Sequence, residues 1–315
     1  MKQYTDSRDA IFEELFSIAL QDPRVVVLSA DTGAFIFKEF KKRIPNQFFN
    51  IGIAEQNMIS VAGGLALEGK RVFVFGISNF VTLRCFEQIR LDICSMGLPI
   101  TILGMGAGYT YSADGPTHHI TEDVAVMRTL PNMTIFSPSD YTQMAMSVHL
   151  AYRNTQATYI RIDKGPLPKL YEASDEDFSS GLRRLKHGKD ITLVATGAWV
   201  GEAIRIAEGL ESVGLEVGVI DLFRIKPVNE NLLRSELAMA SRVATFEEHS
   251  IIGGLGSLVA EVLSQSQMPL PLKIFGTPDQ FRSEVGSREK MREFAGLDRH
   301  RLPDQIHNWC VVDSN

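Results

Sequence analysis

The stretch Val25-Val26-Val27-Leu28 is apolar at every position, and it decides the fold class of this chain. A strand with one face in water would alternate apolar and polar residues, so an uninterrupted apolar run predicts a strand covered on both faces. Such strands belong to parallel sheets with helices on both sides. Similar runs, rich in Val, Ile and Phe, occupy residues 71–75, 100–103, 134–136 and 158–162.

Amphipathic segments lie between these runs, for example residues 55–67, 83–95 and 141–152. The alternation of apolar runs with helical segments predicts a doubly wound α/β domain. An acidic stretch at residues 172–177 and a basic one at 183–189 then interrupt the rhythm. We interpret these two stretches as a connection between domains.

The same rhythm restarts after the connection. Strands are expected at residues 191–195, 215–220, 243–246 and 272–275, and helices at 201–212, 229–240 and 255–263. We therefore predict an α/β fold of two doubly wound domains with mainly parallel sheets. The first domain is expected over residues 1–175 and the second over residues 185–315.

The composition excludes several classes of function. Hydrophobic residues make up 44% and charged residues 22% of the 315 positions, as in an ordinary globular protein. The net charge of -6 leaves no basic excess to bind nucleic acid. No apolar run reaches the roughly 18 residues of a membrane helix, and the N-terminus lacks the apolar core of a signal peptide. Since Cys85, Cys94 and Cys310 lack CxxC spacing, we expect no disulfide framework or zinc site, and a cytoplasmic protein.

Two segments follow expected strands, where α/β sheets place their ligands. In Asn50-Ile51-Gly52-Ile53-Ala54-Glu55 the glutamate opens a helix, and it could serve there only to favour the helix dipole. In Phe75-Gly76-Ile77-Ser78-Asn79-Phe80 the last aromatic ring could belong to the core or form a platform for a ligand.

A third segment is glycine-rich and crowded with titratable groups. It runs from Gly104 to Tyr109 and continues through Ser112-Ala113-Asp114-Gly115-Pro116-Thr117-His118-His119. It matches neither GxGxxG nor the P-loop. Paired histidines without a third ligand nearby are a poor zinc signature, so we expect a polar active-site loop and no metal ligands in this chain. The chain also lacks the GxSxG of a serine hydrolase.

The second domain offers one further candidate. Thr245-Phe246-Glu247-Glu248-His249 ends an expected strand, and Gly253-Gly254-Leu255-Gly256 begins an expected helix. This pattern is compatible with an anion site at a helix N-terminus. It is equally compatible with a tight turn capped by the carboxylates.

Taken together, these segments resemble the C-terminal two-thirds of transketolase, in the family's order and spacing. The matching strings are Ile53-Ala54-Glu55-Gln56-Asn57-Met58, Phe86-Glu87-Gln88-Ile89-Arg90, Ala113-Asp114-Gly115-Pro116-Thr117-His118, Arg128-Thr129-Leu130-Pro131-Asn132-Met133 and Ser137-Pro138-Ser139-Asp140. Deoxyxylulose-phosphate synthase and the β subunits of 2-oxoacid dehydrogenases share the architecture. The resemblance implies a pyrimidine-binding domain for thiamine diphosphate, followed by a transketolase C-terminal-like domain.

The resemblance also implies roles for residues at the cofactor. Glu55 would bond ring nitrogen N1′ of the aminopyrimidine and share a proton with it, which activates the thiazolium ring. Phe80, or a neighbour within a residue of it, would stack on the pyrimidine. Ile53 would lie beside the cofactor.

At the substrate end, Asp114 and His118 match family residues that bond hydroxyls of the donor sugar. His118 could also assist proton transfer, since histidine titrates near neutrality. Arg8 and Lys164 match two arginines that grip the acceptor's phosphate, but a lysine loses the bidentate fork. Phe35 and Gly106 stand where the family has a serine and a histidine, which leaves the acceptor's identity open.

The family binds the cofactor diphosphate through Mg²⁺ with a Gly-Asp-Gly sequence, which is absent here. The resemblance therefore implies a split enzyme whose separate N-terminal-half subunit holds the magnesium, in an α₂β₂ arrangement. The expected reaction transfers a two-carbon ketol unit from a ketose to an aldose, through a carbanion on the cofactor. The alternatives are a subunit of a 2-oxoacid-decarboxylating or deoxyxylulose-phosphate-synthase-like enzyme, or a non-catalytic partner subunit.

Overall fold

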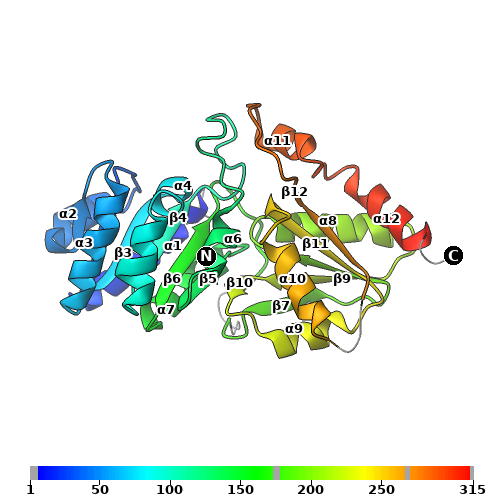
Figure 1. Cartoon of the computed structure of the whole chain (residues 1–315), viewed down its shortest axis with the longest axis horizontal. Coiled ribbons are helices and arrows are strands. Elements are labelled where there is room, and N and C mark those ends of the chain that lie inside the picture. Colours follow the sequence, from blue (N-terminus) through cyan, green and yellow to red (C-terminus); the bar gives the residue numbers. More distant parts are fainter. Residues whose placement is uncertain (1–5, 173–177, 267–269, 313–315) are drawn as a thin grey trace.

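The computed structural model describes residues 6–172, 178–266 and 270–312. Figure 1 shows two α/β units side by side, the first mainly in blue to green and the second in light green to red. The first sheet has the order β10-β5-β6-β4-β3-β1-β2, and the second the order β12-β11-β8-β9-β7. Pairing is parallel except at β10 with β5 and at β7 with β9, so the mainly parallel α/β prediction is confirmed.

The strands of the first sheet are β1 (Val25–Ser29), β2 (Phe48–Asn50), β3 (Arg71–Ile77), β4 (Thr101–Met105), β5 (Met133–Phe136), β6 (Ala157–Ile162) and β10 (Arg224–Lys226). The helices around it are α1 (Ser7–Gln21), α2 (Phe37–Arg43), η1 (Pro45–Gln47), α3 (Glu55–Leu67), α4 (Ser78–Val81), α5 (Phe86–Gln88), the π-helix η2 (Ile89–Ser95), α6 (Asp123–Arg128) and α7 (Tyr141–Arg153).

The strands of the second sheet are β7 (Leu182–Lys186), β8 (Ile191–Ala195), β9 (Val217–Leu222), β11 (Val243–Ser250) and β12 (Leu272–Thr277). Its helices are α8 (Trp199–Glu211), α9 (Glu230–Leu237), α10 (Leu255–Ser264), α11 (Arg288–Phe294) and α12 (Leu302–Val312).

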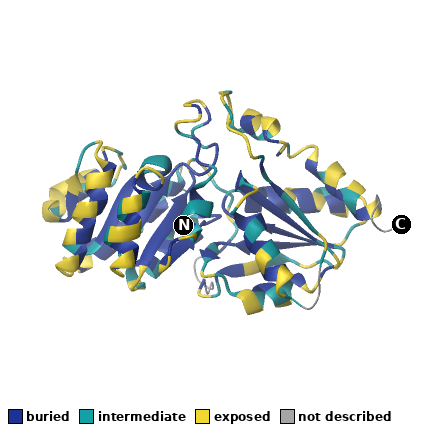
Figure 2. Ribbon diagram, viewed as in Figure 1, coloured by how far each residue is buried: buried dark blue, intermediate teal, exposed yellow. Residues whose placement is uncertain are grey.

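Strand β1 confirms that an all-apolar run lies in a sheet covered on both sides. Val25 and Val27 belong to one buried cluster with α1, α2 and α7, whereas Val26 and Leu28 belong to another with α3 and η2. Successive side chains of a strand point to opposite faces, so all four must be apolar. The buried sheets stand out between the exposed outer surfaces of the helices in Figure 2.

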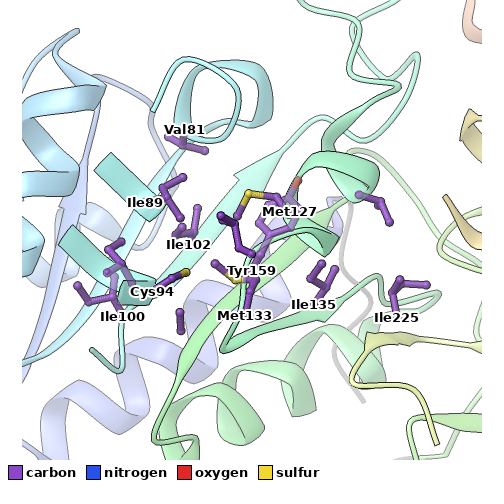
Figure 3. Close-up of a cluster of buried hydrophobic side chains, with 14 of the residues drawn as sticks. Val81, Ile89, Cys94, Ile100, Ile102, Met127, Met133, Ile135, Tyr159 and Ile225 are labelled. Carbon is purple, nitrogen blue, oxygen red and sulfur yellow. The ribbon is translucent and has the colours of Figure 1, made fainter. Parts of the chain in front are cut away.

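The two units are interlocked through β10. This short strand follows β9 of the second sheet but pairs with β5 of the first. Its Ile225 is 1% exposed and joins the core formed by β4, β5, β6 and η2, as Figure 3 shows. The sequence did not predict this strand, and the expected limits at residues 175 and 185 stay a prediction.

One expectation about an element was wrong, and a second was only partly right. The basic stretch at residues 183–189 is largely strand β7, which pairs antiparallel with β9 at the edge of the second sheet. Exposed charges suit an edge strand, which is why the stretch resembles a linker. The expected helix over residues 83–95 begins at Phe86 and continues as the π-helix Ile89–Ser95. Of the predicted acidic connection, residues 173–177 lie outside the described residues.

Candidate active site

Three loops of the first unit meet at the carboxyl edge of its sheet. They follow β2, β3 and β4, the places where parallel sheets position ligands. The side chain of Asn79 joins the second loop to the third, because its Nδ2 donates to the backbone oxygens of Thr117 at 3.0 Å and His119 at 2.7 Å. The loops therefore form one connected site.

Glu55 is the first residue of α3 and is only 3% exposed. Its Oε2 accepts a hydrogen bond from Nη1 of Arg84 at 2.8 Å, while Arg84 itself is 44% exposed. A buried carboxylate needs a counter-charge, and Arg84 supplies it together with the positive end of the helix dipole. Glu55 therefore does more than begin a helix, because it also forms an ion pair with Arg84.

Phe80 contacts both this ion pair and the loop between β4 and α6, residues 106–122, which carries His118 and His119 and is called the histidine loop below. The guanidinium carbon of Arg84 is 4.2 Å from the centre of the Phe80 ring. On its other flank, Phe80 meets His118 edge-to-face at 5.3 Å between ring centres. Glu55, Arg84, Phe80 and His118 thus form a continuous line of contacts, although they come from three separate loops.

Tyr111 extends the line to the predicted substrate residues. The centre of its ring lies 5.9 Å from the centre of the His118 ring, and Nζ of Lys164 lies over the tyrosine ring, 5.0 Å from its centre. Burial raises the pKa of Tyr111 to about 12, and the charges of Arg8 and Asp114 also act on it. Three of the four predicted substrate-binding residues, His118, Lys164 and Asp114, therefore contact one tyrosine.

Tyr111 also fills the space beside Gly106. A Cβ built on Gly106 would lie 2.3 Å from Cε2 of the tyrosine, and the glycine has φ of 104°, which L side chains rarely adopt. The departure from the family's histidine at this position is therefore coupled to the tyrosine five residues later.

Arg8 is occupied by its own neighbours. Its Nη1 donates to the backbone oxygen of Gly33 at 2.9 Å, and its guanidinium lies 3.3 Å from Asp6 and 3.7 Å from Asp9. Phe35 is 77% exposed and lines a cavity of about 390 Å³ together with Asp9 and other residues of α1 and α2. This end of the site carries carboxylates as well as cations.

Ile53 stands apart from the line of contacts. It is 78% exposed in the turn before α3 and follows Gly52, whose φ is 76°. The structure brings Glu55, Phe80 and His118 together and gathers Asp114, Arg8 and Lys164 at one end, but it gives Ile53 no packing partner among the apolar clusters of the described residues.

A glutamate of the second unit, Glu248, binds the backbone of the histidine loop. The carboxylate of Glu248 accepts from the backbone N–H of Tyr109 at 2.6 Å and from Arg288 Nε at 2.8 Å, and it also pairs with Arg292. Arg288 in turn makes a two-pronged pair with Asp163, at 2.6 and 2.9 Å. Although burial alone would raise it, these arginines lower the pKa of Glu248 to about 2.

The candidate anion site of the second unit is a capped turn. Glu247 accepts from the backbone N–H groups of Leu255 at 2.6 Å and Gly256 at 2.8 Å, so its own carboxylate occupies the N-terminus of α10. Burial raises its pKa to about 7. The capping alternative is therefore the correct one.

His118 and His119 differ in environment. His119 is 7% exposed, its ring meets Tyr109 at 5.1 Å, and burial lowers its pKa. His118 is more open, and its Nδ1 lies 3.0 Å from Oγ1 of Thr117. Within the described residues no three His, Cys, Asp or Glu side chains gather as metal ligands, and no helix there is long and apolar enough to cross a membrane.

Sequence reasoning missed Arg84 and Tyr111. Tyr111 lies in the glycine-rich third segment, between its glycines and its Asp-Gly-Pro-Thr-His string, so its position in the sequence could have indicated a place in the site. Arg84 offered none, because it is separated from Glu55 by 29 positions and from the loop by a strand.

Comparison with known proteins identifies the family of the chain. Residues 3–169 match the transketolase pyrimidine binding domain, and residues 181–302 match the transketolase C-terminal domain. The chain belongs to the transketolase family. The resemblance inferred from its sequence motifs is thereby confirmed.

The similarity of this transketolase-family chain to its relatives extends over nearly the whole length of both. It is 36% identical to a subunit of the apulose-4-phosphate transketolase of Phocaeicola vulgatus, covering 94% of each protein. It is 34% identical to the 6-deoxy-6-sulfo-D-fructose transketolase subunit SqwH of Clostridium sp., covering 95% of this chain and 93% of that protein.

One solved structure is similar over the same extent. It is a split gene transketolase in an inactive β4 tetramer, with a TM-score of 0.87 and 35% identity. The match covers 97% of this chain and 99% of that one. The chain is therefore similar to transketolases that are described as subunits or as split, which confirms the prediction of a split transketolase subunit.

Proposed function

We propose that this chain is one subunit of a split transketolase-like enzyme, which transfers a two-carbon ketol unit from a ketose donor to an aldose acceptor. The observation that carries the proposal is the line of contacts from Glu55 through Phe80 and His118 to Tyr111. One end has a buried carboxylate beside an aromatic ring, and the other end has polar groups suited to sugar hydroxyls.

The residues at the carboxylate end fit the pyrimidine half of thiamine diphosphate. Glu55 already accepts from a planar donor there, the guanidinium of Arg84, which lies against the Phe80 ring. An aminopyrimidine is also planar and needs a carboxylate partner and an aromatic neighbour. When bound, the cofactor supplies the carbon nucleophile of the reaction.

The chain's own residues have distinct tasks in this proposal. Glu55 holds the proton shared with the pyrimidine, in a site from which burial excludes water. His118 and Asp114 orient the donor hydroxyls, and His118 can move a proton at the hydroxyl it contacts. Tyr111 sets the distance between His118 and the acceptor end marked by Arg8 and Lys164.

A partner subunit would supply the diphosphate and Mg²⁺ site. The absence of a Gly-Asp-Gly sequence supports this, and so does the similarity to transketolases described as subunits or as split. The exposed residues of α3 include Val61, Gly64 and Leu67, which form a surface for such a partner. Met58 and Gly63 of the same helix are buried within the chain itself and do not belong to that surface. An α₂β₂ assembly and a cytoplasmic location stay predictions.

A direct assay separates the candidate reactions. The chain is co-expressed with a candidate partner that carries Gly-Asp-Gly, and the purified complex receives thiamine diphosphate and Mg²⁺. Ketol transfer predicts that an aldose gains two carbons from a ketose without release of CO₂, as read by mass spectrometry. Release of CO₂ from a 2-oxoacid without ketose turnover would favour the decarboxylating or synthase-like alternative. A complex with neither activity would support the non-catalytic subunit.

A further inference from the structure

Glu55 is bonded through only one of its two carboxylate oxygens. Oε2 accepts from Arg84, whereas no hydrogen bond to Oε1 is formed within the described part of the chain, and Oε1 is not among the fully buried polar atoms that lack a partner there. Glu247 is as deeply buried but has both oxygens engaged, by the N–H groups of Leu255 and Gly256. Asp123 and Asp221 also have one oxygen without a partner, but those oxygens are fully buried, whereas Oε1 of Glu55 is accessible to a ligand.

The position of Arg84 is set by its own surroundings. Its guanidinium packs on Phe80, and its backbone N–H donates to the oxygen of Asn79 at 3.2 Å. The side chain of Asn79 is bonded to the loop that carries His118. Arg84 therefore connects α4 and the histidine loop to the carboxylate of Glu55 on α3.

The pair also lies in a dry environment on one side. Cys85, next to Arg84, is fully buried, and its thiol donates to the backbone oxygen of Phe80 at 3.0 Å. Burial first, and then the negative charge of Glu55, raises the pKa of this thiol to about 12. The carboxylate thus acts electrostatically on its neighbours, and Arg84 is the cation that balances it.

We propose that Arg84 is a positioning residue for Glu55: it holds Oε2 and balances the charge, so that Oε1 remains available to the pyrimidine ring. This inference rests on the proposed function. It assigns Arg84 an effect through Glu55 and no contact of its own with the reacting atoms. Three consequences can be measured separately.

The first consequence concerns rate. In the assembled complex, Arg84→Met slows hydrogen–deuterium exchange at C2 of the bound cofactor by about 10–100-fold, the usual loss when the partner that orients a functional group is removed. The matched control is Arg90→Met, because Arg90 is an exposed arginine on the following helical segment whose one ion pair among the described residues is with Glu87. It leaves the exchange rate within about twofold.

The second consequence concerns coupling. In a double-mutant cycle, Arg84→Met combined with Glu55→Gln exchanges within about twofold of Glu55→Gln alone, because Arg84 acts through the carboxylate. The neutral glutamine also removes the unbalanced buried charge, so the double variant remains interpretable even if Arg84→Met alone folds poorly. Effects that multiply would overturn the proposal.

The third consequence concerns chemistry and binding. Arg84→Lys keeps the charge and one donor, so it recovers part of the lost exchange rate, whereas a rate as low as that of Arg84→Met would contradict the proposal. Titration calorimetry should give a cofactor dissociation constant within about threefold of the wild type, since the diphosphate contributes most of the affinity. A larger loss of binding than of exchange would make Arg84 a binding residue and overturn its assignment. Absence of exchange in the wild-type complex would instead refute the proposed function itself.

Discussion

Glu55 in the first unit and Glu248 in the second have the same exposed fraction, 3%, but differ in how many of their oxygens are paired. Glu248 is surrounded by Arg288, Arg292 and the N–H of Tyr109, which engage both of its oxygens. Glu55 has one half-exposed arginine and one oxygen without a partner in the described chain. Burial alone therefore does not mark a functional carboxylate, and the difference between the two is that Glu55 keeps one oxygen that a ligand can reach.

The largest effect should come from removing the charge of Glu55. In the assembled complex, Glu55→Gln is expected to lower C2 exchange and turnover by roughly 10²–10⁴-fold, the range for a positioned proton-transfer group. The folded chain should be retained, since glutamine can still accept from Arg84. Unchanged exchange would reduce Glu55 to a helix-start residue and remove the distinction between the two carboxylates.

Glu248→Gln should affect folding more than chemistry. Removing one partner from a buried ion-pair cluster leaves Arg288 and Arg292 unbalanced, which lowers the free energy of unfolding by about 3–5 kcal/mol. Denaturant unfolding measures this, with Glu216→Gln as the control, because Glu216 pairs with Lys189 on the surface. A stable Glu248→Gln chain with slow C2 exchange would place this carboxylate in the catalytic machinery.

The same carboxylate should shape the acid stability of the chain. The pKa of Glu248 is about 2 in the folded chain against 4.5 as its ordinary value. Its stabilising contribution is therefore present above pH 4.5 and is lost as the pH falls toward 2, and it amounts to about 3 kcal/mol. The unfolding free energies of the wild type and Glu248→Gln should converge over this pH window. A constant difference between them would contradict the ion-pair explanation.

The two histidines extend the comparison on a smaller scale. His118→Ala should raise the donor KM by roughly tenfold, as expected for one lost hydrogen bond to substrate, while C2 exchange stays near normal. His119→Ala, the control, should instead lower thermal stability, because His119 is buried against Tyr109. Equal loss of folding in both variants would favour a structural role for the pair.

The smallest effect is expected at Arg8. Its charge is already matched by Asp6 and Asp9, so Arg8→Met should change stability by less than about 1 kcal/mol. With an unphosphorylated aldose its acceptor KM should change less than about threefold. A rise above tenfold that is confined to phosphorylated acceptors would show that Arg8 leaves its carboxylates to bind phosphate, as the family resemblance implies.

The sequence predicted much of the fold because the signal is local. The strand runs at residues 25–28, 71–75 and 158–162 and the helix at Glu55–Leu67 follow from the spacing of apolar side chains within each segment. The sequence did not predict the edge strand β7, because an exposed strand carries charged residues as a linker does.

The candidate site divides in the same way. The carboxylate at a helix start and the loop with paired histidines were visible as motifs in single segments. The partnership of Glu55 with Arg84 and the contacts of His118 and Lys164 with Tyr111 were not visible. Each joins residues whose closeness depends on which strands are neighbours.

The sequence by itself determined the α/β class, the strand covered on both faces and the family, and it singled out Glu55 as the carboxylate proposed to activate the cofactor. Only the tertiary structure decided that β10 crosses into the first sheet, that Glu248 holds the histidine loop, and that Glu55 keeps one open oxygen. The physical reason is that apolar periodicity depends on residues a few positions apart, whereas pairing of charges across loops depends on strand order and register, which no local period contains.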